Sequence, residues 1–123
     1  IRMFDPSTRD EFELVSRLEE RLGRNGSAPY VLEVSLQTAS EGLAISGSND
    51  ITRYNLTGSA NFQLRDVASE EVVYTDAVNT FTSYSASQQS VATRVAQRDA
   101  ERRLMVVLAD KITSQLLLNA DQL

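Results

Sequence analysis

The chain has 123 residues, of which 41% are hydrophobic and 24% are charged, and its formal net charge is −5 at pH 7. This composition is typical of a single globular domain over residues 1–123, and the negative charge argues against nucleic acid as a partner. Because the chain contains neither His nor Cys, triads built on Ser-His or Cys-His pairs are excluded and disulfides cannot form. For the same reason we expect no metal site and no cofactor.

The start of the chain bears on export and membrane attachment. No stretch approaches the roughly 20 apolar residues that a membrane-spanning helix needs. The chain opens without Met, on the sequence IRMF, so we interpret its N-terminus as trimmed. An export or lipidation signal would then lie upstream of residue 1.

The first elements predicted are a short strand over residues 1–4 and a helix over residues 9–23, which Gly23 or Gly26 can end. Ser7 or Thr8 can cap this helix, because an acidic residue follows each of them by three positions. Apolar residues at helical spacing give the helix one face for the core. This stripe consists of Phe12, Val15, Leu18 and Leu22.

Alternating apolar and polar residues predict strands at Tyr30–Gln37 and Leu43–Ser46, joined by a tight connection at the sequence ASEG. A longer strand covers Ile51–Asp66. From Tyr54 onwards its apolar residues alternate with uncharged polar residues, which are Asn55, Thr57, Ser59, Asn61 and Gln63. Exposed strand faces usually carry Lys, Glu and Arg. This row of neutral side chains is therefore the most unusual surface feature of the sequence.

The strand over residues 72–85 alternates imperfectly, because Val73 and Phe81 fall out of phase with Val78. A bulge near Asp76–Asn79 would reconcile them, since one extra residue reverses the faces of the residues that follow.

A long helix follows, starting at Ser85 or Ser87 and ending near Leu118. Its residues 104–109, LMVVLA, are apolar around the whole circumference, which indicates burial on more than one side. Either the sheet and the first helix enclose this segment, or a partner covers part of it. The polar segment Ser83–Ser90 before the helix is either a loop with a helix cap or a recognition loop.

The element order β-α-β-β-β-α predicts an α+β fold. A strand, a helix and a second strand suggest a right-handed parallel crossover, and the later strands suggest antiparallel hairpins. We therefore expect a two-layer sandwich, with a mixed four-stranded sheet and two helices packed on one face. The row of neutral side chains would lie on the free face.

Two groups of charged residues are candidate sites. The candidate catalytic carboxylates are Glu33, Asp50, Asp66 and Asp76. They share no motif, and turn formation and solvation explain their positions better than catalysis. Arg94, Arg98 and Arg102 recur every four residues on the long helix, a spacing that can bind phosphate. We favour the alternative of a solvated face, in which Asp99 pairs with Arg102 or Arg103.

Several longer segments resemble the LptE family of lipopolysaccharide-assembly lipoproteins from Gram-negative outer membranes. The most specific of them are RYNLTGSANFQLRD, the strand end FTSY, and the helix ATRVAQRDAERRLMVVLADKI. The segments LVSRLEERLG and YVLEVSL fit the first helix and the next strand of the family. The resemblance covers nearly the whole chain in element order and includes no catalytic signature.

The resemblance implies a non-enzymatic, two-helix and four-strand lipoprotein that is held on the periplasmic side of the outer membrane by an N-terminal lipid. Such a protein plugs the lumen of the β-barrel LptD, helps LptD to assemble, and assists delivery of lipopolysaccharide to the outer leaflet. The neutral row from Asn55 to Gln63 would then face the polar barrel wall, forming hydrogen bonds without the cost of desolvating unpaired charge.

Two features of the family are missing from the sequence. The lipidated N-terminal Cys is absent, and the basic loop residues of the family do not align. Arg53, Arg94 and Arg98 are the nearest candidates for lipopolysaccharide binding. An auxiliary periplasmic lipoprotein of another lipid-transport system is an alternative interpretation, and a small enzyme with a site built only of carboxylates is a third.

Overall fold

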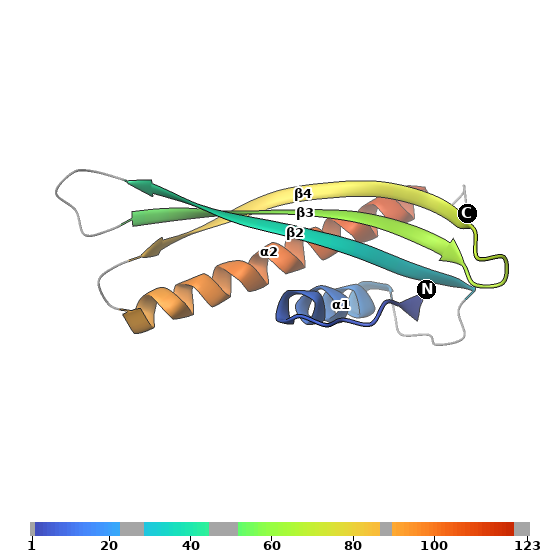
Figure 1. Cartoon of the computed structure of the whole chain (residues 1–123), viewed down its shortest axis with the longest axis horizontal. Coiled ribbons are helices and arrows are strands. Elements are labelled where there is room, and N and C mark those ends of the chain that lie inside the picture. Colours follow the sequence, from blue (N-terminus) through green and yellow to red (C-terminus); the bar gives the residue numbers. More distant parts are fainter. Residues whose placement is uncertain (1, 23–28, 45–51, 87–89, 120–123) are drawn as a thin grey trace.

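The computed structural model of the chain describes residues 2–22, 29–44, 52–86 and 90–119. Its elements in chain order are β1 (Arg2–Met3), α1 (Arg9–Leu22), β2 (Tyr30–Ala44), β3 (Thr52–Asp66), β4 (Val72–Ala86) and α2 (Ser90–Leu118). The molecule is elongated, and the three long strands and α2 all run along its long axis (Figure 1). No described helix has a stretch that is both long and apolar enough to cross a membrane.

A single sheet forms one layer of the fold. Its strand order is β1-β2-β3-β4, and the three long strands are antiparallel neighbours. Their antiparallel pairing and the α+β class agree with the prediction. β1 is much shorter than the other three strands of the sheet, because only Arg2 and Met3 pair with β2. The chain then leaves the sheet before Pro6, a residue without the N–H that a strand ladder requires.

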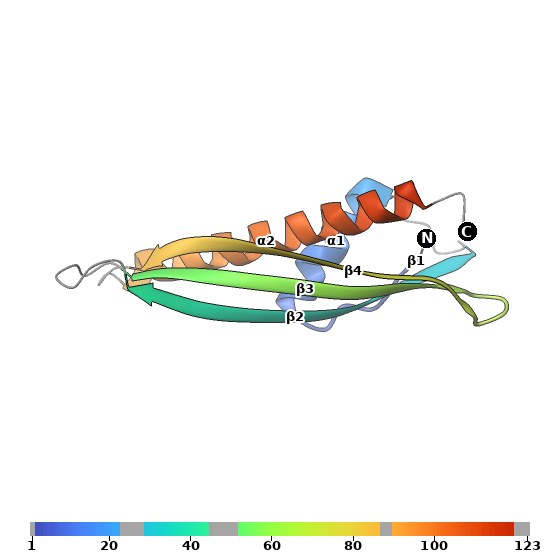
Figure 2. The same cartoon turned by 90° about the horizontal axis from the view of Figure 1, so that it is seen from above.

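Both helices lie on the same face of the sheet (Figure 2). α2 packs against β3 and β4, and α1 packs against α2. The N–H of Glu11 donates to the Thr8 hydroxyl at 3.1 Å, so Thr8 caps α1. Arg17 and Arg21 of α1 both bind Asp110 of α2, each with an N–O distance of 2.9 Å. The hydrogen bond from Arg17 is the main cause that lowers the pKa of Asp110.

The hydrophobic core lies between the two layers. Every second residue of each long strand faces the helices, and on β3 the buried members are Leu56, Gly58, Ala60, Phe62 and Leu64. From the apolar segment of α2, Leu104, Met105, Leu108 and Ala109 are buried as well. The sheet and α1 therefore enclose most of this segment, as one of the two predicted alternatives required. The Val107 side chain lies outside this core and is 36% exposed.

The predicted break in the second strand is wrong. β2 continues through the sequence ASEG to Ala44, and each of its residues pairs with β3 without interruption. Gly42 lies opposite Tyr54, and a Cβ at Gly42 would approach Tyr54 Cε1 to 3.1 Å. The glycine therefore leaves room for an aromatic ring across the strands and does not form a turn. Ser46, the predicted end of the next strand, lies outside the described residues.

The predicted bulge is also misplaced. The register shift lies at the start of β4, because Leu64 pairs with Tyr74 while Arg65 pairs with Val72. From Tyr74 the strand alternates without interruption, so Phe81 does point away from the core. β4 also continues through Ser85 to Ala86, which rules out a helix start at Ser85. The alternative start at Ser87 lies outside the described residues.

Candidate partner-binding face

The sheet has one face that neither helix covers, and the row of neutral side chains predicted from β3 lies on it. These residues alternate along β3 with the buried ones, so they point away from α1 and α2. Thr57 and Asn61 are exposed, and Asn55, Ser59 and Gln63 are half-buried between the neighbouring strands.

The absence of charge extends to both neighbouring strands. Gln37, Ser59 and Asn79 form one row across the sheet. Ala39, Thr57 and Phe81 form the next. We call this surface the neutral face. It consists of Ser35, Gln37 and Ala39 on β2, of Asn55, Thr57, Ser59, Asn61 and Gln63 on β3, and of Thr75, Ala77, Asn79, Phe81 and Ser83 on β4.

Charged residues border the neutral face along the strands. At one end, the Glu33 carboxylate accepts hydrogen bonds from Gln63 Nε2 at 2.8 Å and from Arg65 Nε at 2.9 Å. These two bonds lower the pKa of Glu33 below its ordinary value. At the other end, Glu41 lies directly opposite Asn55, and Arg53 is the next residue of β3 on the same face. The Glu33 carboxylate, near the turn between β3 and β4, is thus paired with Arg65 within the sheet. The neutral face therefore carries no unbalanced charge from this pair.

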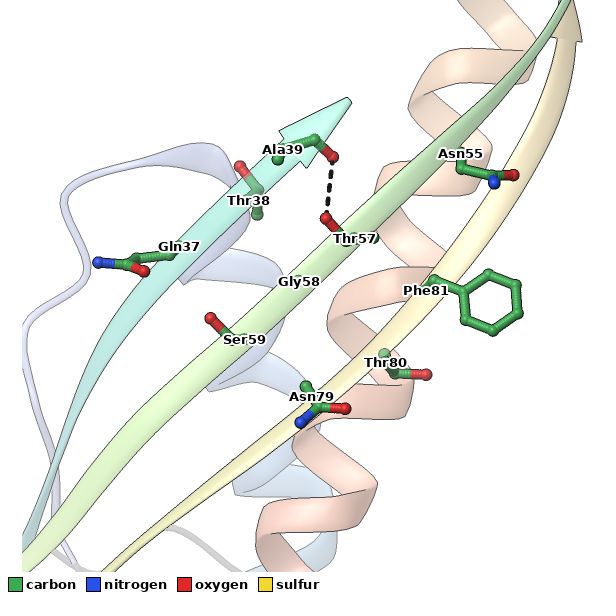
Figure 3. A pocket seen from close by; sticks show the side chains of 10 residues that line it. All are labelled: Gln37, Thr38, Ala39, Asn55, Thr57, Gly58, Ser59, Asn79, Thr80 and Phe81. Atoms are coloured by element: carbon green, nitrogen blue, oxygen red, sulfur yellow. Dashed lines mark hydrogen bonds between the residues drawn. The ribbon is translucent and has the colours of Figure 1, made fainter. Parts of the chain in front are cut away.

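An open hollow of about 900 Å³ lies on the neutral face (Figure 3). Its walls come from all three long strands, and the Thr57 hydroxyl donates a hydrogen bond of 3.5 Å to the Ala39 carbonyl within it. The lining residues are Gln37, Thr38, Ala39, Asn55, Thr57, Gly58, Ser59, Asn79, Thr80 and Phe81. A second hollow of about 600 Å³ adjoins Glu33, Asn61 and Gln63. The face is therefore uneven enough to receive side chains of another molecule.

Phe81 is a surface residue whose importance the sequence analysis missed. Its ring projects from β4, the outermost strand of the sheet, at the side of the hollow and is 67% exposed (Figure 3). The strict alternation of Ala77, Asn79 and Phe81 would have revealed its direction, had the bulge not been placed between Asp76 and Asn79. Exposed aromatic residues are common anchors in protein interfaces.

The three arginines expected to bind lipopolysaccharide do not form one patch. Arg53 pairs with Ser85 on the uncovered face of the sheet, whereas Arg94 and Arg98 are exposed on α2, across the sheet. They do share one end of the molecule, because β3 and α2 both begin there (Figure 1). The arginine stripe of α2 is shortened by pairing, since Asp99 binds Arg102 at 3.3 Å. Asp99 also binds Arg103, at 2.9 Å, as the solvated-face alternative predicted.

The described candidate catalytic carboxylates accept hydrogen bonds from neighbouring groups of the sheet and its turn. Asp66 Oδ1 accepts hydrogen bonds from the N–H groups of Ala68 and Ser69 and so shapes the β3–β4 turn. Asp76 binds the Tyr74 hydroxyl at 2.7 Å, and this bond lowers the pKa of Asp76. Asp50 lies outside the described residues. Among the described residues no group of three or more acidic side chains is arranged to hold a metal ion.

These features define a two-layer domain of the α+β sandwich class, with helices on one side of its sheet and the uncovered neutral face on the other. The sequence model of the LptE family, described as lipopolysaccharide-assembly, matches residues 1–116. The chain therefore belongs to the LptE family, a family of non-enzymatic lipoproteins that act in lipopolysaccharide transport. No curated protein sequence matches the chain.

Solved structures with this fold come from several bacteria. A protein from Caulobacter crescentus described as a lipoprotein is 24% identical, with a TM-score of 0.78 over 94% of this chain and 86% of that one. A minor lipoprotein from Acinetobacter baumannii is 21% identical, with a TM-score of 0.69 over 97% and 92%. The rare lipoprotein B from Shewanella oneidensis is 12% identical, with a TM-score of 0.67 over the same shares. At these identities the likeness establishes the fold alone.

Proposed function

We propose that this chain is the outer-membrane lipoprotein that plugs the LptD β-barrel, supports its assembly, and assists delivery of lipopolysaccharide to the outer leaflet. In this proposal an N-terminal lipid upstream of residue 1 anchors it on the periplasmic side. Membership of the LptE family supports a role in lipopolysaccharide assembly. The neutral face supports the position inside the barrel, and it is the observation on which the proposal depends.

The physical argument concerns desolvation. The lumen of a large membrane β-barrel is lined by polar side chains. A plug that docks against this wall loses water from its surface, and each unpaired charge buried in this way costs several kcal/mol. Neutral hydrogen-bonding groups cost less and find partners in many orientations. A surface such as Gln37, Ser59 and Asn79, with Phe81 as an apolar anchor, is suited to this environment.

Lipopolysaccharide contact is the second part of the proposal. Arg53, Arg94 and Arg98 would meet the phosphates of the ligand, because guanidinium groups bind phosphate with paired hydrogen bonds. Their location at one end of the elongated domain favours contact with a ligand that passes that end, on either side of the sheet (Figure 1). The alternative is an auxiliary lipoprotein of another lipid-transport system, which would use the same face against a transporter.

The test places charge on the neutral face. Ser59→Glu combined with Asn61→Glu adds two carboxylates to the middle of β3. The control, Ser16→Glu with Ser114→Glu, adds the same charge at exposed positions of α1 and α2. Each tagged full-length lipoprotein is captured from detergent-solubilised membranes, and the proteins bound to it are identified.

We expect the control to recover the barrel as the wild type does, and the neutral-face variant to lose at least nine-tenths of it. Equal recovery with both variants would refute the neutral face as the docking surface. Recovery of a transporter in place of a barrel would favour the alternative function.

A further inference from the structure

The two long edges of the sheet are treated differently by the rest of the molecule. On the outer edge of β4, side chains occupy the backbone groups. The Ala77 N–H donates to Asp76 Oδ1 at 2.8 Å, and Lys111 of α2 donates to the Asn79 carbonyl at 2.7 Å. Arg103 of α2 donates to the Ser83 carbonyl at 3.4 Å. Side chains bound in this way hinder another strand from pairing with the edge.

Among the described residues, the outer edge of β2 is covered by a strand at its start alone. β1 pairs with Val31 and Leu32, and the Phe4 N–H donates to the Leu32 carbonyl at 3.1 Å. Beyond Leu32, no strand in the described part of the chain lies on this side of β2. Because successive residues of a strand direct their backbone groups to opposite edges, every second residue after Leu32 points its N–H and C=O outward. These residues are Val34, Leu36, Thr38, Ser40 and Gly42.

The exposed part of this edge lacks the usual protection. Natural edge strands carry lysines, prolines or bulges that prevent pairing with another chain. From Val34 to Gly42, a segment that the structure describes throughout, Glu41 is the only charged residue and there is no proline. The register between β2 and β3 contains no bulge. The edge is therefore long, regular and neutral, and it borders the hollow of the neutral face through Gln37 and Ala39.

We propose that the outer edge of β2, from Val34 to Gly42, pairs with an extended segment of the barrel partner and so adds a strand to the sheet. This inference rests on the proposed function. The strands of a closed barrel wall are already paired on both sides. The added strand must therefore come from a loop or a terminal segment of the barrel protein that enters the lumen.

The side chains of β2 indicate the chemistry of this segment. Val34 and Leu36 are half-buried on the helix side, where an apolar neighbour on the added strand would extend the core. Ser35 and Gln37 on the other side suit polar, uncharged neighbours. Pairing with a second copy of this chain is disfavoured in the antiparallel register centred on Gln37, because Glu33 of one copy would lie opposite Glu41 of the other.

One pair of variants isolates the backbone contribution. Thr38 is exposed, and its N–H points to the outer edge, away from the ladder with β3. Thr38→Pro removes this N–H, a change that edge strands tolerate, whereas Thr38→Ala removes the side chain and keeps the N–H. We expect Thr38→Pro to bind the co-expressed barrel about tenfold more weakly than Thr38→Ala, with similar melting temperatures for both free proteins.

Hydrogen exchange on the wild-type complex supplies an independent readout, which stands even if Thr38→Pro fails to fold. The peptide that spans Val34–Gly42 is followed in the free lipoprotein and in the purified complex with the barrel. We expect its outward amides to exchange rapidly in the free protein and to become protected in the complex. The β4 segment Ala77–Ser83 is the matched comparison for the opposite edge.

A complex that forms without new protection in Val34–Gly42 would overturn the inference and leave the proposed function intact. The absence of any complex with the barrel would overturn both. If the same amides become protected when the free protein is concentrated and its mass doubles, the edge belongs to a second copy and the assignment to the barrel is wrong.

Discussion

Replacing Phe81 with Ala tests the neutral face most directly, and the size of the effect follows from the exposure of the ring. Phe81 is 67% exposed. A phenylalanine side chain buries about 200 Å² when fully enclosed. Covering the exposed part would thus remove roughly 130 Å² from water, which at about 25 cal/mol per Å² is worth about 3 kcal/mol. We therefore expect Phe81→Ala to weaken binding of the barrel by about 100-fold.

The chain offers a matched control on its other side. Phe12 of α1 is 58% exposed, so Phe12→Ala removes a similar ring from a helix surface. Both variants should unfold at nearly the wild-type temperature, because neither ring is part of the core. The assay is competition between each variant and the tagged wild type for co-expressed barrel, with recovery measured as a function of expression ratio. If Phe81→Ala competes as well as Phe12→Ala, the neutral face does not contact the barrel through this ring.

Three further predictions concern the core, the helix pair and the ligand. Gly58→Ala would place a Cβ 3.0 Å from a δ-carbon of α2, so we expect it to lower the free energy of unfolding by about 1–2 kcal/mol in urea titrations; unchanged stability would contradict this close packing. Asp110→Asn removes the ion pairs to α1, and because folding lowers the pKa of Asp110, its stabilisation is present above the unfolded-state pKa and lost as pH falls through the folded-state value. The variant should be about 1 kcal/mol less stable at neutral pH and equal to wild type in strong acid, whereas a pH-independent difference would count against the pair. Arg94→Gln combined with Arg98→Gln should reduce capture of lipopolysaccharide about tenfold at low salt. Arg102→Gln should not, because Arg102 is already paired with Asp99. Equal effects of the two changes would contradict a ligand site at Arg94 and Arg98.

The edge of β2 and the neutral face together suggest how one small domain serves two needs. Binding of a neutral surface to the hydrated wall of a barrel lumen depends little on salt concentration. A regular strand edge adds backbone hydrogen bonds that do not depend on the sequence of the partner. Lys111 and Arg103 hinder the same pairing at β4. In our proposal the domain would therefore add a strand at the edge of β2 in preference to β4, which would fix its orientation relative to the partner.

The sequence by itself determined the elements whose signal is local. Period-two alternation in Tyr54–Leu64 depends on which side chains face water, and the order of the residues specifies it. The predicted apolar stripe of the first helix was only partly right, because Phe12 is 58% exposed and Leu14, outside the stripe, is buried. The same alternation determined that Asn55 and its neighbours share one face. Local signals were misleading where a residue is selected by its contact with a residue on the neighbouring strand. Gly42 is an example, because it leaves room for the ring of Tyr54.

Only the tertiary structure decided which surfaces remain available. Three features depend on contacts between residues far apart in the chain. α2 binds the edge of β4, no described strand covers the edge of β2 past Leu32, and the sheet separates Arg53 from Arg94. Such contacts are set by the packing of whole elements, and no short stretch of sequence encodes them.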